Sequence, residues 1–424
     1  MADLVYAIDF GTSNSLIAAA GADQVSDPLP IDPQQEDPSI LKSVLFSPAR
    51  GKWFFGQEAI DSYGELLHEG RLLRSFKKYL PDPSFERTSI HGASFSIIDI
   101  ASTFLKEMRQ RANAHLGKDI DKVVMGRPAA FSTDIKKDKL AQDRLEAGAK
   151  AAGFKEVYFC PEPIAAAFEF RSTMREPKTV LIADFGGGTS DFTVMKMSQE
   201  PFKESDVLSL GGLSLAGDAY DGSIMEHMIS PHFGSEVTYK LPLGKNELKI
   251  PRHLLKRLCS APDIAMLGKQ DIMSLLRDAQ RWSMNPDDAL KMQRLFVLVE
   301  DHLGYKLFQS IEASKRKLSE QASDIFEFDY PEIEISQEVF SKDFTERSAG
   351  LTDQIVACLD ETLAKAGLTA DQIEVVCCTG GTAKIASLRS ALVQKFGEQK
   401  LMQHRHFHSV INGLAVRARD LCLG

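Results

Sequence analysis

The stretch Leu181–Val194, LIADFGGGTSDFTV, decides the fold. An apolar run brings the carboxylate of Asp184 to three consecutive glycines, and an alternating run from Thr189 to Val194 follows at once. Alternation is typical of a half-buried strand, so the pattern predicts a strand, a tight turn and a second strand. Glycines lack a Cβ, and their backbone N–H groups can therefore converge on an anion. An ordinary glycine hairpin with an exposed aspartate is the alternative on this stretch alone.

Two commoner nucleotide-binding patterns fail at the same place. A glycine-rich turn that enters a helix would indicate a Rossmann or P-loop site, but no helical pattern follows here. The sixth position of a G-x-G-x-x-G beginning at Gly186 is Asp191, and the chain contains no G-x-x-x-x-G-K-[ST]. What remains is a hairpin anion site at Gly186, Gly187 and Gly188. Because Asp184 would repel a phosphate there, a phosphate ligand implies an Mg²⁺ ion between them.

The opening segment Leu4–Ala20, LVYAIDFGTSNSLIAAA, repeats this plan. Asp-Phe-Gly occurs at Asp9 and again at Asp184, which are 184 − 9 = 175 positions apart. The shared strand, turn and strand around both copies predicts a duplicated domain. Two such hairpins that face each other would clamp a triphosphate, with Asp9 and Asp184 holding one cation through water.

Length and composition limit the classes of protein. A chain of 424 residues with 43% apolar and 26% charged residues is expected to form two or three ordinary globular domains. The net charge of −9 argues against a dedicated nucleic-acid binder. Neither a signal peptide nor a membrane span is visible. The six cysteines form no C-x-x-C pair, which favours free thiols in a reducing cytoplasm.

Three further segments carry candidate residues. Glu162 stands between two prolines where a predicted strand meets a predicted helix, and it could either cap the helix or face a cleft. Lys77 falls in the run Glu58–Leu80, which is predicted to be helical, and a lysine there is normally solvated. Gly217 and Asp218 follow a predicted strand and offer another backbone approach to a ligand.

One helix face and one loop complete the set. The predicted helix Leu303–Ser319 has polar residues at i, i+3, i+4 and i+7, which either line a nucleotide or form exposed ion pairs. These residues are Glu312, Lys315, Arg316 and Ser319. A second apolar strand ends in Thr379-Gly380-Gly381-Thr382, followed by a predicted helix, so that backbone can approach a ligand there.

Seven motifs in order resemble those of the ATPase domain of Hsp70 chaperones, within the actin, hexokinase and Hsp70 superfamily. Between Ile8 and Val416 these are IDFGTSNS, EPIAAAFEF, ADFGGGTSDFTV, GDAYD, EASKRKLS, TGGTAKI and NGLAV. The resemblance implies an α/β, two-lobed, actin-like ATPase fold of duplicated ribonuclease H-like domains. The expected lobes are residues 1–176, with a peripheral subdomain at about 37–97, and residues 177–424, with a peripheral subdomain at about 219–305.

The resemblance also implies roles for single residues. The expected first phosphate loop is Gly11, Thr12, Ser13 and Asn14, and the second is Gly186, Gly187, Gly188 and Thr189. Asp9 and Asp184 correspond to ligands of Mg²⁺-bound water. The expected catalytic residues are Lys77, with Lys78 as the competing assignment, Glu162, Asp191 and Thr189. The expected nucleotide contacts are Gly217, Asp218, Glu312, Lys315, Arg316, Ser319, Gly380, Gly381, Thr382 and Lys384, the last in place of the family's arginine.

The implied function is a slow, Mg²⁺-dependent ATPase that binds ATP and ADP and changes conformation with its nucleotide. The chain ends soon after the ATPase fold, without the family's linker and client-binding domain, so a stand-alone Hsp70-like chaperone of the cytoplasm with an unknown protein partner or client is expected. Two rivals share the superfamily: a filament-forming actin relative and a small-molecule kinase. A nucleotide-sensing binding module without turnover is a third.

Overall fold

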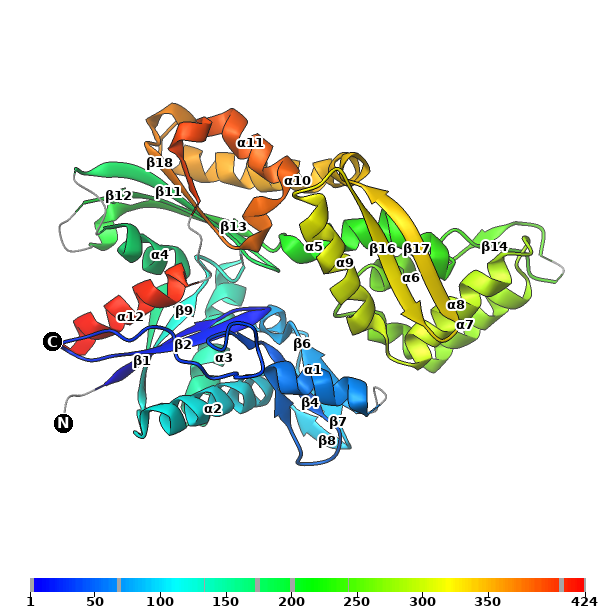
Figure 1. Cartoon of the computed structure of the whole chain (residues 1–424), viewed down its shortest axis with the longest axis horizontal. Coiled ribbons are helices and arrows are strands. Elements are labelled where there is room, and N and C mark those ends of the chain that lie inside the picture. Colours follow the sequence, from blue (N-terminus) through cyan, green and yellow to red (C-terminus); the bar gives the residue numbers. More distant parts are fainter. Residues whose placement is uncertain are drawn as a thin grey trace. The chain divides into compact units, whose positions relative to one another are not determined.

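The computed structural model describes residues 4–66, 70–132, 134–171, 176–198, 203–242, 244–403 and 408–422. The chain groups into two compact units. The first contains residues 1–216, 354–383 and 390–424, and the second contains residues 217–353 and 384–389. Both large sheets belong to the first unit (Figure 1).

Two five-stranded mixed sheets share one topology. The first has the order β10-β9-β1-β2-β3, with β1 (Val5–Phe10), β2 (Asn14–Ala20), β3 (Leu41–Lys42), β9 (Lys122–Arg127) and β10 (Glu156–Pro161). The second has the order β19-β18-β11-β12-β13, with β11 (Lys178–Phe185), β12 (Ser190–Met197), β13 (Val207–Leu213), β18 (Val375–Thr379) and β19 (Leu401–Gln403). In each, an antiparallel hairpin is extended by one antiparallel strand and two parallel strands. The duplicated α/β fold is therefore confirmed, while the lobe boundaries stay a prediction.

Two helices form an apolar layer that contacts both sheets. They are α4 (Glu162–Arg171) and α12 (Ser409–Cys422), and they pack on each other. One cluster of buried side chains joins Ala7 and Ala18 of the first sheet, Ile411 and Leu414 of α12, and Ile182 of the second sheet. The small side chains on the first sheet let the helix backbone come close to the strands.

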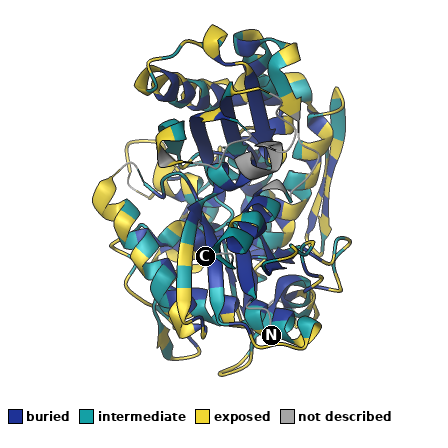
Figure 2. Ribbon diagram, turned by 90° about the vertical axis from the view of Figure 1, so that its left-hand side faces the viewer, coloured by how far each residue is buried: buried dark blue, intermediate teal, exposed yellow. Residues whose placement is uncertain are grey.

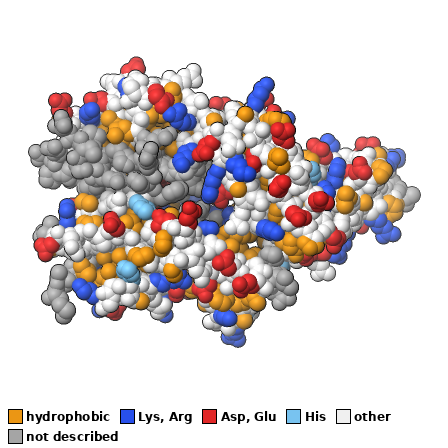
Figure 3. Space-filling model, in the orientation of Figure 1, with side chains coloured by type: hydrophobic (Ala, Val, Ile, Leu, Met, Phe, Trp, Pro, Cys, Tyr) orange, Lys and Arg blue, Asp and Glu red, His pale blue; other side chains and the backbone are white. Residues whose placement is uncertain are grey.

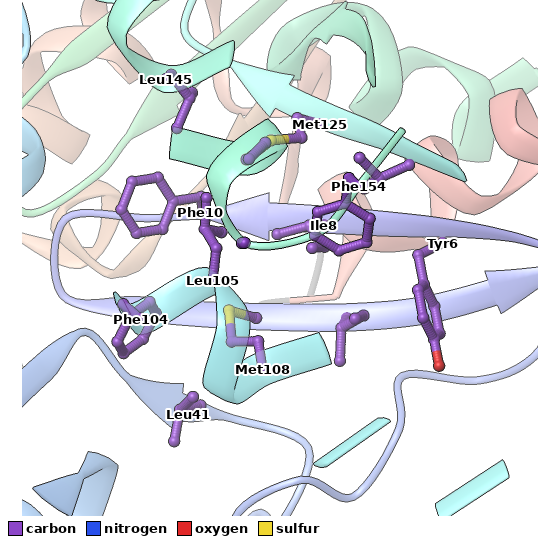
Figure 4. Packing of buried hydrophobic residues seen from close by; sticks show 14 of the residues in the cluster. Tyr6, Ile8, Phe10, Leu41, Phe104, Leu105, Met108, Met125, Leu145 and Phe154 are labelled. Carbon is purple, nitrogen blue, oxygen red and sulfur yellow. The ribbon is translucent and has the colours of Figure 1, made fainter. Parts of the chain in front are cut away.

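The other face of the first sheet is covered by α2 (Ile97–Leu116) and α3 (Ile135–Ala151). Figure 4 shows Ile8 and Phe10 of β1 among Phe104, Leu105 and Met108 of α2. Helix α2 begins at a capping box in which Ser96 and Asp99 each accept a backbone N–H. Burial of each large side chain contributes roughly 1.5–3 kcal/mol, so this face is a main source of stability.

The remaining elements form smaller sheets and outer helices. The other helices are α1 (Gly56–Glu65), α5 (Gly217–Ile224), α6 (Arg252–Leu258), α7 (Gln270–Arg281), α8 (Asp288–Glu300), α9 (Gly304–Leu318), α10 (Ser341–Lys365) and α11 (Ala386–Phe396). The other strands are β4 (Val44–Ser47), β5 (Phe54–Phe55), β6 (Arg71–Arg74), β7 (Thr88–Ile90), β8 (Ala93–Phe95), β14 (Thr238–Tyr239), β15 (Leu248–Lys249), β16 (Ser323–Tyr330) and β17 (Ile333–Phe340). Figure 2 shows strands of the large sheets as buried ribbons, with exposed residues on outer helices.

The predicted helix Glu58–Leu80 is wrong in its second half. Helix α1 ends at Glu65, the chain then forms β6, which pairs antiparallel with β4, and a single 3₁₀ turn covers Phe76–Tyr79. Gly70 (φ +111°) and Ser75 (φ +51°) adopt backbone conformations that no α-helix contains. Lys77 therefore lies on a tight turn after a strand.

The close approach of α12 to α4 depends on Gly413. A Cβ at this position would overlap the backbone carbonyl of Ala165, which cannot move away as a side chain could. We expect Gly413→Ala to destabilise the fold by about 1–3 kcal/mol, measured by urea unfolding. Gly350→Ala on α10 is the matched control, since nothing lies within 4 Å of its added Cβ. Alanine there should be neutral or stabilising, and equal effects of both variants would contradict the packing argument.

The helices, the cysteines and the surface charges can be compared with the expectations from composition. Among the described residues, none of the helices is long and apolar enough to cross a membrane. None of the six cysteines, all of them among the described residues, forms a disulfide bond. On the face seen in Figure 3, acidic and basic side chains are interspersed.

Candidate functional site

The two aspartates lie near the ends of equivalent strands of the two sheets. Asp9 is the fifth residue of β1, and Asp184 is the seventh of β11, one residue before each strand ends. The residues that follow each strand form a turn into the antiparallel neighbour, with Phe10 paired to Ser15 and Phe185 paired to Ser190. The fold thus places both carboxylates beside a glycine-containing turn, as the repeat predicted.

The first turn contains Gly11, Thr12, Ser13 and Asn14. A Cβ on Gly11 would overlap the carbonyl of Asn14, so the turn requires glycine at this position. Ser43 holds the turn from outside: its N–H donates to the Ser13 carbonyl at 2.8 Å, and its hydroxyl donates to the Gly11 carbonyl at 2.8 Å. With these carbonyls bonded outward, the backbone of the turn is held in one conformation.

The second turn contains Gly186, Gly187, Gly188 and Thr189. It closes through a hydrogen bond from the Gly186 N–H to the Thr189 carbonyl at 2.9 Å. A Cβ on Gly188 would lie 3.6 Å from the Thr12 methyl group, so the two turns lie next to each other. The structure brings together the two glycine-containing turns that the sequence predicted separately.

Three more predicted residues lie near these turns. Asp191 is the direct cross-strand partner of Asp184 and is 2% exposed. Glu162, at the junction of β10 and α4, accepts a hydrogen bond from the Lys77 ammonium group at 3.0 Å, and both side chains are about nine-tenths buried. Lys78 is exposed, and its ammonium group lies over the Tyr79 ring. Of the two competing lysines, Lys77 is the one in the carboxylate cluster.

Burial and mutual repulsion dominate the electrostatics of this cluster. Four carboxyl groups (Asp9, Glu162, Asp184, Asp191) interact electrostatically with one ammonium group, that of Lys77, and with every group ionised the charge would be −4 + 1 = −3. Burial, followed by repulsion from Glu162, raises the pKa of Asp9 to about 8 and the pKa of Asp184 to about 6. The same causes raise the pKa of Asp191 well above its usual range. The cluster therefore lacks positive charge.

The residues present fit a hydrated Mg²⁺ ion. The described residues contain no group of three or more His, Cys, Asp or Glu side chains placed to hold a metal directly. Asp9 and Asp184 alone would leave most of the six positions that Mg²⁺ prefers to water and phosphate oxygens, which is how this ion usually binds. The Oδ1 atom of Asp191 is buried and accepts no hydrogen bond from any described residue. An ion with its waters would supply both the missing charge and the missing donor.

Thr379, the last residue of β18, and Thr382, three residues later, form hydrogen bonds to Asp184 and to the second turn. The Thr379 hydroxyl donates to Oδ1 of Asp184 at 2.7 Å, and the Thr382 hydroxyl donates to the Gly186 carbonyl at 2.8 Å. Gly380 has φ +82°, and a Cβ there would overlap the Phe185 carbonyl. Gly381, exposed, begins the 3₁₀ turn Gly381–Lys384. Sequence reasoning missed Thr379, although its place at the end of an apolar strand, just before two glycines, was the available signal.

The bond from Thr379 orients the Asp184 carboxylate and favours its ionised form. We expect Thr379→Val, which keeps the shape and removes the hydroxyl, to weaken Mg²⁺-dependent nucleotide binding about tenfold, since a bond to a charged group is worth roughly 1.5 kcal/mol. Titration calorimetry with and without Mg²⁺ would measure this. Thr369→Val, whose hydroxyl only caps the surface 3₁₀ turn Ala370–Gln372, is the control. Equal affinities of Thr379→Val and wild type would contradict a role of the Thr379 hydroxyl in orienting Asp184 for Mg²⁺-dependent binding.

The other predicted nucleotide contacts lie in the second unit. Lys315 on α9 forms a buried ion pair with Asp221 at 2.8 Å and donates to the Gly217 carbonyl at 3.2 Å. Burial raises the pKa of Asp221 to about 6 despite this partner. Asp218 lies in the first turn of α5, and Lys384 is exposed. Lys315 is thus tied to the motif GDAYD, and sequence reasoning missed Asp221 within that motif.

On the same face of α9, Arg316 pairs with Glu312 one turn earlier at 2.5 Å, with both side chains exposed. The Ser319 hydroxyl donates to the Lys315 carbonyl at 2.9 Å. The helical spacing predicted this face correctly. The exposed ion pair of the alternative interpretation is present, and a role of Glu312 and Arg316 in nucleotide binding stays a prediction.

Comparisons with known proteins find similarity to chaperone proteins. A family model described as "Hsp70 protein" matches residues 81–261. A chaperone protein HscA homolog of Pseudoalteromonas atlantica is 26% identical over 256 residues, covering 57% of this chain and 39% of that protein. A chaperone protein HscA homolog of Verminephrobacter eiseniae is 23% identical over 434 residues, covering 98% of this chain and 58% of that protein. The chain spans less than two thirds of the length of these curated relatives.

Proposed function

This chain belongs to the Hsp70 family through its ATPase domain, and we propose that it binds ATP with Mg²⁺ at the two glycine turns and hydrolyses it slowly. One observation carries the proposal: four carboxylates and Lys77 lie beside two adjacent glycine-containing turns. Such turns suit phosphate oxygens, and a carboxylate cluster of formal charge −3 suits the cation that accompanies them.

In this mechanism the protein mainly positions groups and stabilises charge. The N–H groups of residues 11–14 and 187–189 would hold the phosphate oxygens, with Thr12, Ser13 and Thr189 adding hydroxyl donors, while the Gly186 N–H closes the second turn. Lys77 would stabilise charge on the transferred phosphoryl group. Bound Mg²⁺, held by Asp9 and Asp184 through water, would neutralise charge on the phosphate oxygens. Glu162 and Asp191 would orient the attacking water through their buried carboxylates.

In the proposed reaction, water attacks the terminal phosphate directly, and no covalent intermediate with the protein forms. The water oxygen forms a bond to the terminal phosphorus while the bond from that phosphorus to the bridging oxygen breaks, so that ADP and inorganic phosphate leave. The unbonded Oδ1 of Asp191 is an acceptor for a proton of this water. The remaining nucleotide contacts, Glu312, Lys315, Arg316, Ser319, Gly217, Asp218, Gly380, Gly381, Thr382 and Lys384, would hold the adenosine and its phosphates. Lysine has no guanidinium plane to stack on adenine, so Lys384 would bind the base weakly.

We further propose that nucleotide state drives a conformational switch read by a protein partner or client. The relatives are named as chaperone proteins, which supports a chaperone-like role. A cytoplasmic location stays part of the proposal and rests on the free cysteines, which suit a reducing compartment.

Single-turnover hydrolysis of ATP with and without Mg²⁺ tests this function. Slow, Mg²⁺-dependent release of phosphate from purified protein is the expected result. Tight ATP binding without hydrolysis would instead favour a nucleotide-sensing module. Sedimentation of filaments with ATP would favour the actin-like alternative, and ATP consumption that requires a metabolite would favour a kinase.

A further inference from the structure

One arginine binds the chain segment that leaves the Lys77 turn. Arg144 lies on α3, and its guanidinium donates to the carbonyl oxygens of four residues between positions 79 and 85. Nη1 reaches Tyr79 at 3.3 Å, Leu80 at 2.9 Å and Asp82 at 2.8 Å, and Nη2 reaches Phe85 at 3.4 Å. The first of these carbonyls belongs to the same 3₁₀ turn as Lys77.

The segment keeps its own shape through local hydrogen bonds. Its sequence, YLPDPSF, contains two prolines, which have no N–H to donate. The other N–H groups of residues 80–85 donate locally: Leu80 to the Lys77 carbonyl at 3.1 Å, Asp82 to the Tyr79 carbonyl at 3.2 Å, Phe85 to the Asp82 carbonyl at 3.3 Å and Ser84 to the Asp82 carboxylate at 2.9 Å. These bonds do not attach the segment to α3, whereas the guanidinium of Arg144 does. A planar guanidinium can donate to several carbonyls at once, and lysine cannot reproduce that arrangement. Arg144 therefore fixes where the segment lies against α3.

On its other side, the Lys77 turn is fixed by apolar contacts. Phe76 is 3% exposed and packs against Phe10 and Phe104, with ring centroids 5.7 Å apart in each pair. The ammonium group of Lys77 then lies 3.0 Å from Glu162. With Phe76 buried before it and Arg144 bound after it, the lysine is held at both ends of its turn.

We propose that Arg144 is a positioning residue for Lys77, acting through the turn and not by contact with the nucleotide. The proposal rests on the proposed function, in which Lys77 acts on the transferred phosphoryl group. Without Arg144 the segment 79–85 would lose four acceptor contacts and move, and the ammonium group would leave its place beside Glu162 for part of the time. A displacement of about 1 Å at such a group can cost roughly 100-fold in rate.

Kinetics on the full chain test the positioning role. Arg144→Gln should lower kcat for ATP about 10- to 100-fold and leave KM near the wild-type value. In a Lys77→Ala background, Arg144→Gln should have no further effect on kcat, because its only route to the reaction is through Lys77. Equal losses in both backgrounds, or a loss confined to KM, would overturn the proposal.

A second readout does not require the protein to be an ATPase. Lys77 should resist acylation by a water-soluble amine reagent in wild type, since it is 8% exposed, while the exposed neighbour Lys78 reacts and serves as the internal control. Mass spectrometry should find faster labelling of Lys77 in Arg144→Gln, and intermediate labelling in Arg144→Lys, which keeps a donor if the first variant folds poorly. Unchanged labelling in both variants would overturn the proposal.

Arg109→Gln is the matched control for both readouts. Like Arg144, Arg109 donates to a backbone carbonyl, that of Ile120, and it also donates to the carboxylate of Asp119. Neither partner belongs to the segment that carries Lys77. Arg109→Gln should change neither kcat nor the labelling of Lys77. A wild-type protein without hydrolysis would refute the proposed function alone, and the labelling experiment would still decide whether Arg144 fixes the lysine.

Discussion

Replacing Lys77 by alanine should abolish most ATP hydrolysis while ATP still binds. Among the five side chains of the cluster Lys77 supplies the one positive charge, and its ammonium group is bonded to Glu162 at 3.0 Å in a nearly buried position. A charge placed in this way is most valuable when negative charge shifts in the transition state, so kcat should fall about 100-fold or more. Single-turnover hydrolysis, with ATP binding measured in parallel by calorimetry, gives the two quantities.

Lys78→Ala is the matched control because it changes the adjacent, exposed lysine. It should hydrolyse ATP at the wild-type rate. Lys77→Ala leaves Glu162 buried without its cation, which is destabilising, so Lys77→Ala combined with Glu162→Gln separates loss of charge from loss of fold. A low rate in Lys78→Ala with a normal rate in Lys77→Ala would reverse the assignment of the lysine.

The two hairpins could be predicted because their signals are local. Each consists of an apolar strand, an Asp-Phe-Gly and a second strand, and strand alternation and glycine turns both depend on neighbouring residues. The same holds for α9, whose polar face follows directly from helical spacing. The two hairpins and α9 can therefore be predicted without knowledge of contacts between residues far apart in the sequence.

The turn that carries Lys77 could not be predicted in the same way. Leu72 and Leu73 fit a helical pattern as well as a strand, and the pairing of β6 with β4 decides between them. The bond from Thr379 to Asp184 joins residues 195 positions apart and depends on the parallel pairing of β18 with β11. The contacts of Arg144 likewise arise from packing of α3 against a segment some 60 residues earlier. Such contacts need the folded chain.

Replacing Asp184 by asparagine should separate nucleotide binding from its dependence on Mg²⁺. Asparagine keeps an oxygen to accept the Thr379 hydroxyl, which lies 2.7 Å from Oδ1, and removes only the charge. If Asp184 holds the ion through water, its loss should weaken Mg²⁺ binding roughly 10- to 100-fold, as changes to groups outside the direct ligands usually do. The gain in ATP affinity on adding Mg²⁺ should shrink accordingly, and hydrolysis should fall with it.

The same substitution should stabilise the protein when no ion is present. Burial and the charge of Glu162 raise the pKa of Asp184 to about 6, so the folded state holds this carboxylate in ionised form at a cost that asparagine does not have. Thermal unfolding at pH 8 in chelator should therefore show a higher Tm for Asp184→Asn than for wild type. Adding Mg²⁺ and ATP should reduce this difference in Tm or reverse its sign. Asp121→Asn is the control, since Asp121 precedes β9 at the opposite end of the first sheet from Asp9 and pairs with Lys155 at the surface. A lower Tm in Asp184→Asn without Mg²⁺ would mean that the carboxylate stabilises the fold itself. A buried carboxylate that serves to bind a cation should instead destabilise the fold as long as the cation is absent.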